Sequence, residues 1–409
     1  MKLKSLLLGS VAAAGLSTGA FAADLGVVMP TLDACDAVGM QGVPLIDHCL
    51  TITGGVAYSA MWGDYKGSVT YITSAMGTTT ASDNDAGFFG PVDWDSVVTT
   101  TLSLEATHNT AFGKGIAHID FTNTDTWGVW NGVITSTGTT VLMVGNAYLS
   151  VGDSTIVTLG RADSIADFGD DDPLNYGGLF RSDHVGTGVG TPAMPATGGH
   201  VIQINSDLGN GVGVGLALEA IDTLMPSLVG VLTYAGDGIS AHATGLWDGA
   251  TFGVHAGFDA TFDMFEIVGA VAVDSASNWN VLGSASATFD MFTLAVSGEA
   301  ANGGEWGVGG SATAAITDGV TLNLGGRYFD NSVDQAWQGE ANVTADLTDT
   351  LSASATVGYI DSTLAATSNV YFEGSLTWAP SDSLSMTASG GANSLGAYYV
   401  GLSGENNFS

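Results

Sequence analysis

The chain has 409 residues, with 7 Lys and Arg against 41 Asp and Glu, which gives a formal net charge of −34 at pH 7. This balance disfavours nucleic acid as a partner, because nucleic-acid-binding proteins neutralise phosphates with basic side chains. Acidic, glycine-rich chains are often disordered, but 45% hydrophobic residues in a regular alternation argue against disorder. No segment after the N-terminus approaches about 18 continuous apolar residues, so the sequence predicts no transmembrane helix.

Residues 1–22 have the pattern of a secretory signal peptide. Lys2 and Lys4 precede a short apolar centre, and Ala20-Phe21-Ala22 forms a small-residue cleavage site. A membrane anchor is the alternative, but the apolar centre is short for one. We therefore expect export and a mature chain from Ala23, with a charge of 5 − 41 = −36 once Lys2 and Lys4 are removed.

The only two cysteines, Cys35 and Cys49, precede or begin the first strand. Because an exported chain enters an oxidising compartment, we predict a disulfide between them. A metal or nucleophilic role would need further ligands or a base, and only His48 is adjacent. The sequence predicts no metal site there.

The first predicted strand runs from about His48 to Trp62, and a long polar loop follows as far as Trp94. Within that loop, residues 83–87 have the composition of the start of a calcium loop, but the twelfth position is Trp94 instead of Glu, so the match is poor. Further strands flank turns at 112–115 and 152–154. The longest irregular stretch is 163–199, and a stretch of that length is usually functional.

Later in the chain, tight turns centred on Asp and Gly separate runs of alternating side chains. Two nearly identical turns, Phe262-Asp263-Met264-Phe265 and Phe289-Asp290-Met291-Phe292, are the clearest. The others lie at 207–211, 236–238, 317–319, 348–350 and 381–383. With the two earlier turns these make nine hairpins, or eighteen strands, and the first and last strands raise the prediction to about twenty.

Each strand has one apolar face and one face of Ser, Thr, Gly and Asn with scattered carboxylates and almost no Lys. A soluble sandwich would instead fill one face with large residues and place Lys and Glu on the other. A polar face suits a hydrated lumen, and only a closed barrel leaves no unpaired edge in lipid. We therefore predict an all-β, transmembrane antiparallel β-barrel with an even number of strands. A solenoid is the alternative, but no repeat signature accompanies the hairpins.

Two stretches carry a family resemblance. The first comprises 35–39, Pro44, Asp47 and 49–56, and the second comprises 147–152 leading into 159–168. They resemble the entry into the first strand, and the strands before the third loop, of alphaproteobacterial outer-membrane porins, the general diffusion porins. The resemblance is strong over residues 1 to about 250. It implies sixteen strands, a homotrimer, a Gram-negative outer membrane, and a third extracellular loop folded inward. Such barrels end in an aromatic residue, whereas here Ser409 follows Phe408.

The stretch 163–199 is accordingly the candidate constriction loop, within a single barrel domain of 23–409. Its charged residues could narrow the channel and attract cations, since carboxylates in a constriction raise the local cation concentration. An acidic, solvated loop at the mouth is the alternative. The candidate constriction residues are Arg161, Asp163, Asp167, Asp170, Asp171, Asp172, Arg181 and Asp183.

Strand alternation also predicts lumen-facing wall residues. Arg327 is one of few basic residues and is expected to be the remnant of a basic wall. The wall candidates are Asp120, Asp259, Arg327, Glu340 and Glu373, with Glu105, His118, Glu219, His255 and Glu299 on the same face. Aromatic residues near strand ends are expected to form interfacial girdles, with a sugar-binding ladder as the alternative; these are Phe262, Phe265, Phe289, Phe292, Tyr328 and Trp378.

The predicted function is a water-filled channel for passive diffusion of small hydrophilic solutes and ions, preferring cations. A substrate-specific channel, for example one for sugars, is the alternative. An outer-membrane enzyme would need Ser, His and a carboxylate gathered at one rim, and the 7 His residues are scattered. We expect no cofactor, although carboxylates could hold divalent cations loosely. The expected partners are outer-membrane lipid, solutes, ions and two further copies of the chain.

Overall fold

The computed structural model describes residues 43–45, 48–64, 72–74, 77–79, 93–130, 133–136, 142–168, 173–179, 198–330, 335–362 and 367–409. The predicted signal peptide and Cys35 lie outside these ranges. Over the described residues the chain is all β-structure. No helix in them is long and apolar enough to cross a membrane.

The strands of the first half of the chain vary widely in length. They are β1 (Val43–Leu45), β2 (His48–Asp64), β3 (Ile72–Ser74), β4 (Gly77–Thr79), β5 (Asp93–Thr110), β6 (Gly113–Trp130), β7 (Val133–Ser136), β8 (Met143–Gly152), β9 (Thr155–Ala162), β10 (Gly199–Gly209), β11 (Val212–Glu219) and β12 (Ser227–Gly236). The predicted first strand is thus confirmed as β2. The short hairpin of β3 and β4 lies in the segment that the sequence analysis took as a polar loop.

The second half is a regular series of hairpins. Its strands are β13 (Ile239–Trp247), β14 (Phe252–Phe262), β15 (Phe265–Asp274), β16 (Trp279–Phe289), β17 (Phe292–Ala301), β18 (Glu305–Thr317), β19 (Val320–Asp330), β20 (Gln335–Thr348), β21 (Leu351–Ser362), β22 (Thr367–Ser381), β23 (Leu384–Asn393) and β24 (Tyr398–Phe408).

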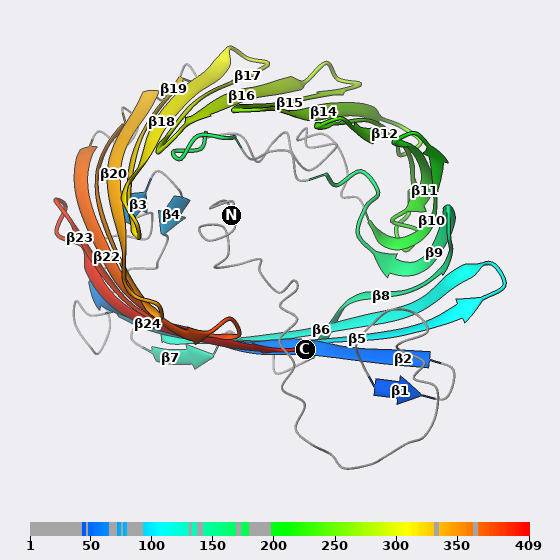
Figure 1. Ribbon diagram of the computed structural model, residues 1–409, viewed down its shortest axis with the longest axis horizontal. Coiled ribbons are helices and arrows are strands. Elements are labelled where there is room, and N and C mark those ends of the chain that lie inside the picture. The colour runs from blue at the N-terminus through cyan, green and yellow to red at the C-terminus, as the bar shows by residue number, and fades with distance from the viewer. Residues whose placement is uncertain are drawn as a thin grey trace.

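These strands form a closed barrel of 20 antiparallel strands (Figure 1). The ring runs β2, β5, β6, β8, β9 and then β10 to β24 in order, and it closes where β2 pairs with β24 from Gly54↔Phe408 to Asp64↔Tyr398. Four short strands are not part of this ring. Strand β1 pairs only with β2, β7 pairs only with β6, and β3 and β4 pair with each other. The turn count of about twenty is confirmed. The sixteen strands implied by the family resemblance are wrong for this chain, because the later hairpins add strands.

The tight turns require left-handed backbone, and the sequence supplies residues that tolerate it. Asp263 and Asp290 have φ of 51° and 52°, and Asp237 has φ of 52° followed by Gly238 at 79°. Two-residue hairpin loops favour Asp and Gly at such positions. Strand β14 accordingly ends at Phe262 and β15 begins at Phe265, as the repeated Phe-Asp-Met-Phe sequence predicted.

The outer face of the barrel is apolar and the inner face is polar. In β14 the side chains of Val254 and Phe258 are 45% and 46% exposed on the outside, whereas His255 between them is fully buried on the inside. The same alternation continues in β15, where Val271 is 44% exposed and Ala270 and Ala272 are buried. A continuous apolar exterior of this kind is stable only in lipid, so the barrel is transmembrane.

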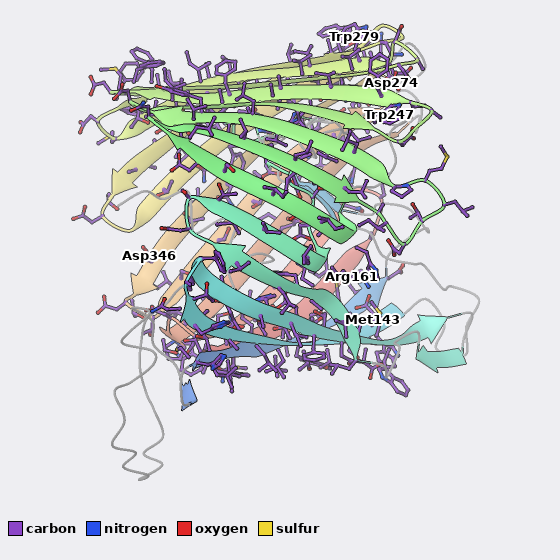
Figure 2. The ribbon with its side chains drawn as sticks, turned by 90° about the vertical axis from the view of Figure 1, so that its right-hand side faces the viewer. Met143, Arg161, Trp247, Asp274, Trp279 and Asp346 are labelled. Carbon is purple, nitrogen blue, oxygen red and sulfur yellow. The ribbon has the colours of Figure 1, made fainter. Side chains whose placement is uncertain are left out.

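Two aromatic girdles bound this apolar band. At the end with the tight turns, Phe262, Phe265, Phe289, Phe292 and Trp378 are each 44–50% exposed, as predicted. At the opposite end the girdle is rich in tryptophan, and Trp247 and Trp279 lie there together, far from Asp346 (Figure 2). Phe252 and Phe262 end the same strand, ten residues apart; at a rise of roughly 3.3 Å and a tilt near 40° they are about 25 Å apart along the membrane normal. That matches the height of an outer-membrane apolar band.

Candidate functional site: the lumen and its inward loop

The third loop, residues 163–198 between β9 and β10, folds into the lumen. Its described pieces, 163–168 and 173–179, lie inside the ring of strands (Figure 1). Glu219 of β11 is fully buried and accepts hydrogen bonds from both ends of the loop, from Ile165 N at 3.0 Å and from Gly198 N at 2.9 Å. Gln203 also holds the start of the loop, because its Nε2 donates a hydrogen bond to Asp163 O at 2.7 Å. One carboxylate thus joins the start of the loop to its end.

The next part of the loop packs on the inner wall through apolar and aromatic contacts. Ala166 is fully buried in a cluster with Ala217, Val229, Val231 and Leu246 of β11, β12 and β13. Phe168 stacks on the ring of His242, with 3.9 Å between centroids and 11° between planes. Residues 165–168 of the loop therefore pack on the wall formed by β11, β12 and β13.

The piece 173–179 is bound to the wall formed by β16, β17 and β18. Leu174 N donates to Ser284 Oγ at 2.8 Å, and Tyr176 N donates to Ser311 Oγ at 2.8 Å. Between them, Ser297 Oγ donates to the side-chain oxygen of Asn175. Inward serines on three successive strands thus satisfy the loop's polar groups, which would otherwise be costly to bury.

Tyr176 adds a longer connection, to β20. Its hydroxyl donates to Glu340 Oε1 at 2.6 Å, and Tyr371 donates to Glu340 Oε2, also at 2.6 Å. Burial, followed by the hydrogen bond to Glu340, raises the pKa of the Tyr176 phenol above its ordinary value. The phenol therefore remains a donor, and Glu340 joins the tip of the loop to the barrel wall. We call the contact between Tyr176 and Glu340 the loop latch.

Glycines on the inner face of β18 and β19 make room for the loop. A Cβ at Gly309 would lie 2.9 Å from Asn175 Nδ2 and 3.0 Å from Gly178 O. A Cβ at Gly325 would lie 2.9 Å from the ring of Tyr176. All three distances are shorter than normal carbon contacts, so a larger residue at either position would displace the loop.

Among the predicted wall residues, Asp120 belongs to a polar cluster on β5 and β6. His118 Nε2 lies 2.9 Å from Asp120 Oδ2, and His118 Nδ1 lies 3.4 Å from Glu105 Oε2. The ring of Tyr148 on β8 stacks against His118 at 4.9 Å. Strand alternation places Asp259, Glu340 and Glu373 on the inner face too, but on other strands, so the wall residues line the lumen without forming one site.

Arg327 faces the lumen on β19, and its guanidinium is half-buried beside Gln338. Its Nε and Nη2 both donate to Gln338 Oε1, at 3.1 and 2.9 Å, and Gln338 in turn donates to Tyr371 at 2.9 Å. Arg327 thus belongs to the wall network next to the loop latch. It is the one inward-facing arginine on the described strands, and no basic wall surrounds it there.

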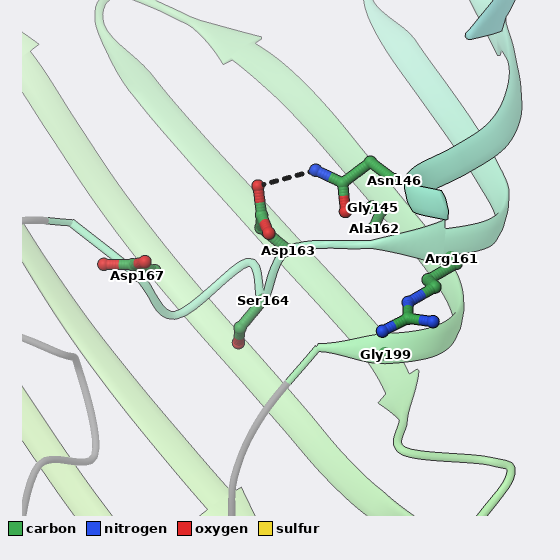
Figure 3. Close-up of a pocket in the computed structure, with 8 residues that line it drawn as sticks. All are labelled: Gly145, Asn146, Arg161, Ala162, Asp163, Ser164, Asp167 and Gly199. Atoms are coloured by element: carbon green, nitrogen blue, oxygen red, sulfur yellow. Dashed lines mark hydrogen bonds between the residues drawn. The ribbon is translucent and has the colours of Figure 1, made fainter. Parts of the chain in front are cut away.

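The described constriction candidates lie at the start of the third loop. Asp163 and Asp167 are exposed and, with Arg161 and Asn146, line a cavity of about 390 Å³. Asn146 Nδ2 donates to Asp163 Oδ2 at 3.1 Å, as Figure 3 shows, while Asp167 points away from that pair. Arg161 is the last residue but one of β9, so it lies at the rim, and it is on the same strand face as the 46% exposed Leu159. The other five candidates, Asp170, Asp171, Asp172, Arg181 and Asp183, fall outside the described residues.

Functional residues that the sequence analysis did not single out are those that hold the loop. Ser284, Ser297 and Ser311 were not named, and Glu219 and Glu340 were placed on the lumen face without a partner. The sequence indicates only that these side chains face the lumen, because they alternate with apolar residues along their strands, and many other polar residues do the same. Within the described ranges, no group of three or more His, Cys, Asp or Glu side chains could hold a metal ion. Cys49 is fully buried at the start of β2.

No known family profile matches the sequence, and no curated protein matches it either. Solved structures do match in shape. A double variant of OccD1 (OprD) aligns over 92% of this chain and 98% of its own, with 9% identity and a TM-score of 0.50. OprD from Pseudomonas aeruginosa aligns over 88% and 93%, with 9% identity and a TM-score of 0.49. A variant of the Rh. blastica porin aligns over 88% and 100%, with 12% identity and a TM-score of 0.42. The first likeness shows a shared barrel fold, and the resemblance to alphaproteobacterial porins stays a prediction.

Proposed function

We propose that the protein is an outer-membrane channel for passive diffusion of small hydrophilic solutes and ions, with a preference for cations. One observation carries this proposal: on the described strands and loop, the lumen-facing charges are almost all carboxylates. They include Asp95, Glu105, Asp120, Asp163, Asp167, Glu219, Asp259, Glu266, Asp274, Glu299, Glu305, Glu340, Glu373 and Glu405. The basic side chains on the inner face of the described strands are Arg327, within the lumen, and Lys114, near the tight-turn rim.

A lumen with this charge would concentrate cations and exclude anions. Low-dielectric walls focus the field of their charges into the water between them, so the local cation concentration rises. Rings of carboxylates give cation preference in other channels for the same reason. Asp163 and Asp167 are the exposed carboxylates of the described loop residues and line the cavity, and we propose that they attract cations there.

The proposal includes the constriction by the third loop, with Asp170, Asp171 and Asp172 placed where the loop crosses the lumen. It also includes export by a cleaved signal peptide, a disulfide between Cys35 and Cys49, and a homotrimer in the Gram-negative outer membrane. Outer-membrane barrels have short periplasmic turns and longer external loops. The tight-turn rim would accordingly face the periplasm, and the rim with the third loop would face outward.

Liposome swelling tests the channel. Vesicles that contain the purified protein should swell in isotonic sugars and amino acids at rates that fall with solute size. Vesicles without protein are the control. Absence of swelling for every solute would contradict a channel. Fast swelling for a single sugar class, with other solutes of equal size excluded, would contradict general diffusion and support the substrate-specific alternative.

A further inference from the structure

Two histidines lie side by side at the tight-turn rim, outside the lumen. His48 is the first residue of β2, and His108 lies near the end of β5. The register pairs Cys49 with Thr107, so the preceding His48 lies directly across from His108. Their ring centroids are 4.7 Å apart with 41° between the planes. The sequence gives no hint of this pair, because 59 residues lie between its members.

We infer that His48 and His108 form a binding site for a divalent transition-metal ion of the Ni²⁺, Cu²⁺ and Zn²⁺ class. Imidazole nitrogens are good ligands for these three ions. Among the divalent ions of the first transition row, sites of this kind bind Cu²⁺, Ni²⁺ and Zn²⁺ more tightly than Mn²⁺ or Fe²⁺. Carboxylate-preferring ions such as Ca²⁺ and Mg²⁺ would not select a site made of two imidazoles. The inference is independent of the proposed channel function.

The spacing of the two rings fits a shared metal ion. With metal–nitrogen bonds of about 2.05 Å and about 1.15 Å from nitrogen to ring centre, each centroid would lie about 3.2 Å from the ion. Two such rings in cis positions at 90° would then have centroids about 4.5 Å apart, and at the tetrahedral angle about 5.2 Å. The observed 4.7 Å lies between these values. The separation of the two rings is therefore compatible with a shared metal ion.

The surroundings leave the pair accessible to water. The last residue of β24, Phe408, pairs with Gly54, so β2 extends beyond the end of β24 at its start, where β1 pairs with it instead and Leu45 lies opposite His48. His48 is exposed and His108 is half-buried. The ring of His108 lies over Gly115 of β6, where a Cβ would be only 2.6 Å from its Cε1. Glycine at 115 thus allows the ring to lie in the position that faces His48.

Three other described histidines, His118, His242 and His255, have different surroundings. His118 is flanked by Asp120 at one ring nitrogen and Glu105 at the other, so these three side chains do not converge on one point. His242 is covered by Phe168 inside the barrel and packs against His255. A metal bound at the rim should therefore depend on His48 and His108 and be indifferent to His118. A bound ion would also join β2 to β5 next to Cys49 and stabilise the folded state by mass action.

The test is calorimetric titration of the untagged, detergent-solubilised full chain with NiCl₂ at pH 7.5. We expect one saturable site whose affinity falls at least tenfold in His48→Asn and in His108→Asn, and falls in Gly115→Ala, which keeps both imidazoles but displaces the His108 ring. His118→Asn should bind like the wild type. Binding should weaken at acid pH, because protonated imidazole cannot coordinate a metal.

A spectroscopic measurement keeps the proposal testable if a variant folds poorly. Cu²⁺ added to the wild-type protein should show an electron paramagnetic resonance spectrum with two imidazole nitrogens coupled to the metal. The proposal is overturned by absence of saturable Ni²⁺ binding, by binding that survives both His48→Asn and His108→Asn, by binding that is lost in His118→Asn, or by a spectrum with a single coupled nitrogen.

Discussion

Replacement of Tyr176 by Phe removes one hydroxyl, and with it the loop latch, and leaves the other contacts of the loop in place. The lost contact is the 2.6 Å hydrogen bond from the Tyr176 hydroxyl to Glu340 Oε1. The backbone bonds from Leu174 and Tyr176 to Ser284 and Ser311 remain, so the loop should still fold into the lumen. What changes is the equilibrium between a docked and an undocked loop tip.

The size of the effect follows from the charge on the acceptor. A hydrogen bond to a charged group contributes about 1.5–3 kcal/mol to stability, more than a neutral pair. Each 1.4 kcal/mol is a factor of ten in an equilibrium constant, so the undocked population should rise roughly 10- to 150-fold. If the loop narrows the channel, the undocked state passes more current than the docked state.

Single-channel recording in planar bilayers measures this population directly. The Tyr176→Phe channel should spend at least tenfold more time at a current level above the main wild-type level. Tyr371→Phe is the matched control, because it removes the other 2.6 Å bond to Glu340 but does not touch the loop. Identical level occupancies in Tyr176→Phe and wild type, or a larger change in Tyr371→Phe than in Tyr176→Phe, would refute the reasoning.

Three further predictions concern packing, charge and covalent structure. Gly309→Ala should lower the free energy of unfolding by about 1–3 kcal/mol through overpacking against the loop, whereas Gly283→Ala, on the outer face with nothing within 4 Å of its Cβ position, should leave it unchanged in chemical denaturation. Neutralising the three loop aspartates should reduce the preference for potassium over chloride, and the same charge change at the tight-turn rim should reduce it less; the two sets are Asp170→Asn, Asp171→Asn and Asp172→Asn against Asp237→Asn, Asp263→Asn and Asp290→Asn. Mass spectrometry of the unreduced, exported protein should find a peptide that contains Cys35 linked to one that contains Cys49, and free thiols at both positions would contradict the predicted disulfide.

The barrel could be predicted from the sequence because its information is local. Alternation along a strand such as Phe252–Phe262 reports which face meets lipid, and each Asp-centred turn reports where a strand ends. Counting those turns gave the strand number more accurately than the family resemblance did. Tyr148 and His118, by contrast, meet only because β6 and β8 pair in one particular register.

The arrangement of the third loop could not be predicted, since it depends on contacts between distant residues. Tyr176 and Glu340 are 164 residues apart, and Leu174 and Ser284 are 110 apart. Ser284 looks like any other lumen-facing serine until the loop is placed against it. Arg327 illustrates the same limit. Strand alternation correctly predicted that its side chain faces the lumen, but it could not predict that the guanidinium binds Gln338 on the neighbouring strand instead of forming part of a basic wall.

The central claim, a cation-preferring channel, is tested most directly by the reversal potential of the wild-type protein in a planar bilayer under a tenfold KCl gradient. Ideal selectivity for one ion gives a potential of about 59 mV in magnitude. The acidic lumen predicts a value displaced from zero toward the potassium equilibrium potential, and smaller in magnitude at higher salt as screening increases. A reversal potential at zero or toward the chloride equilibrium potential would contradict the account.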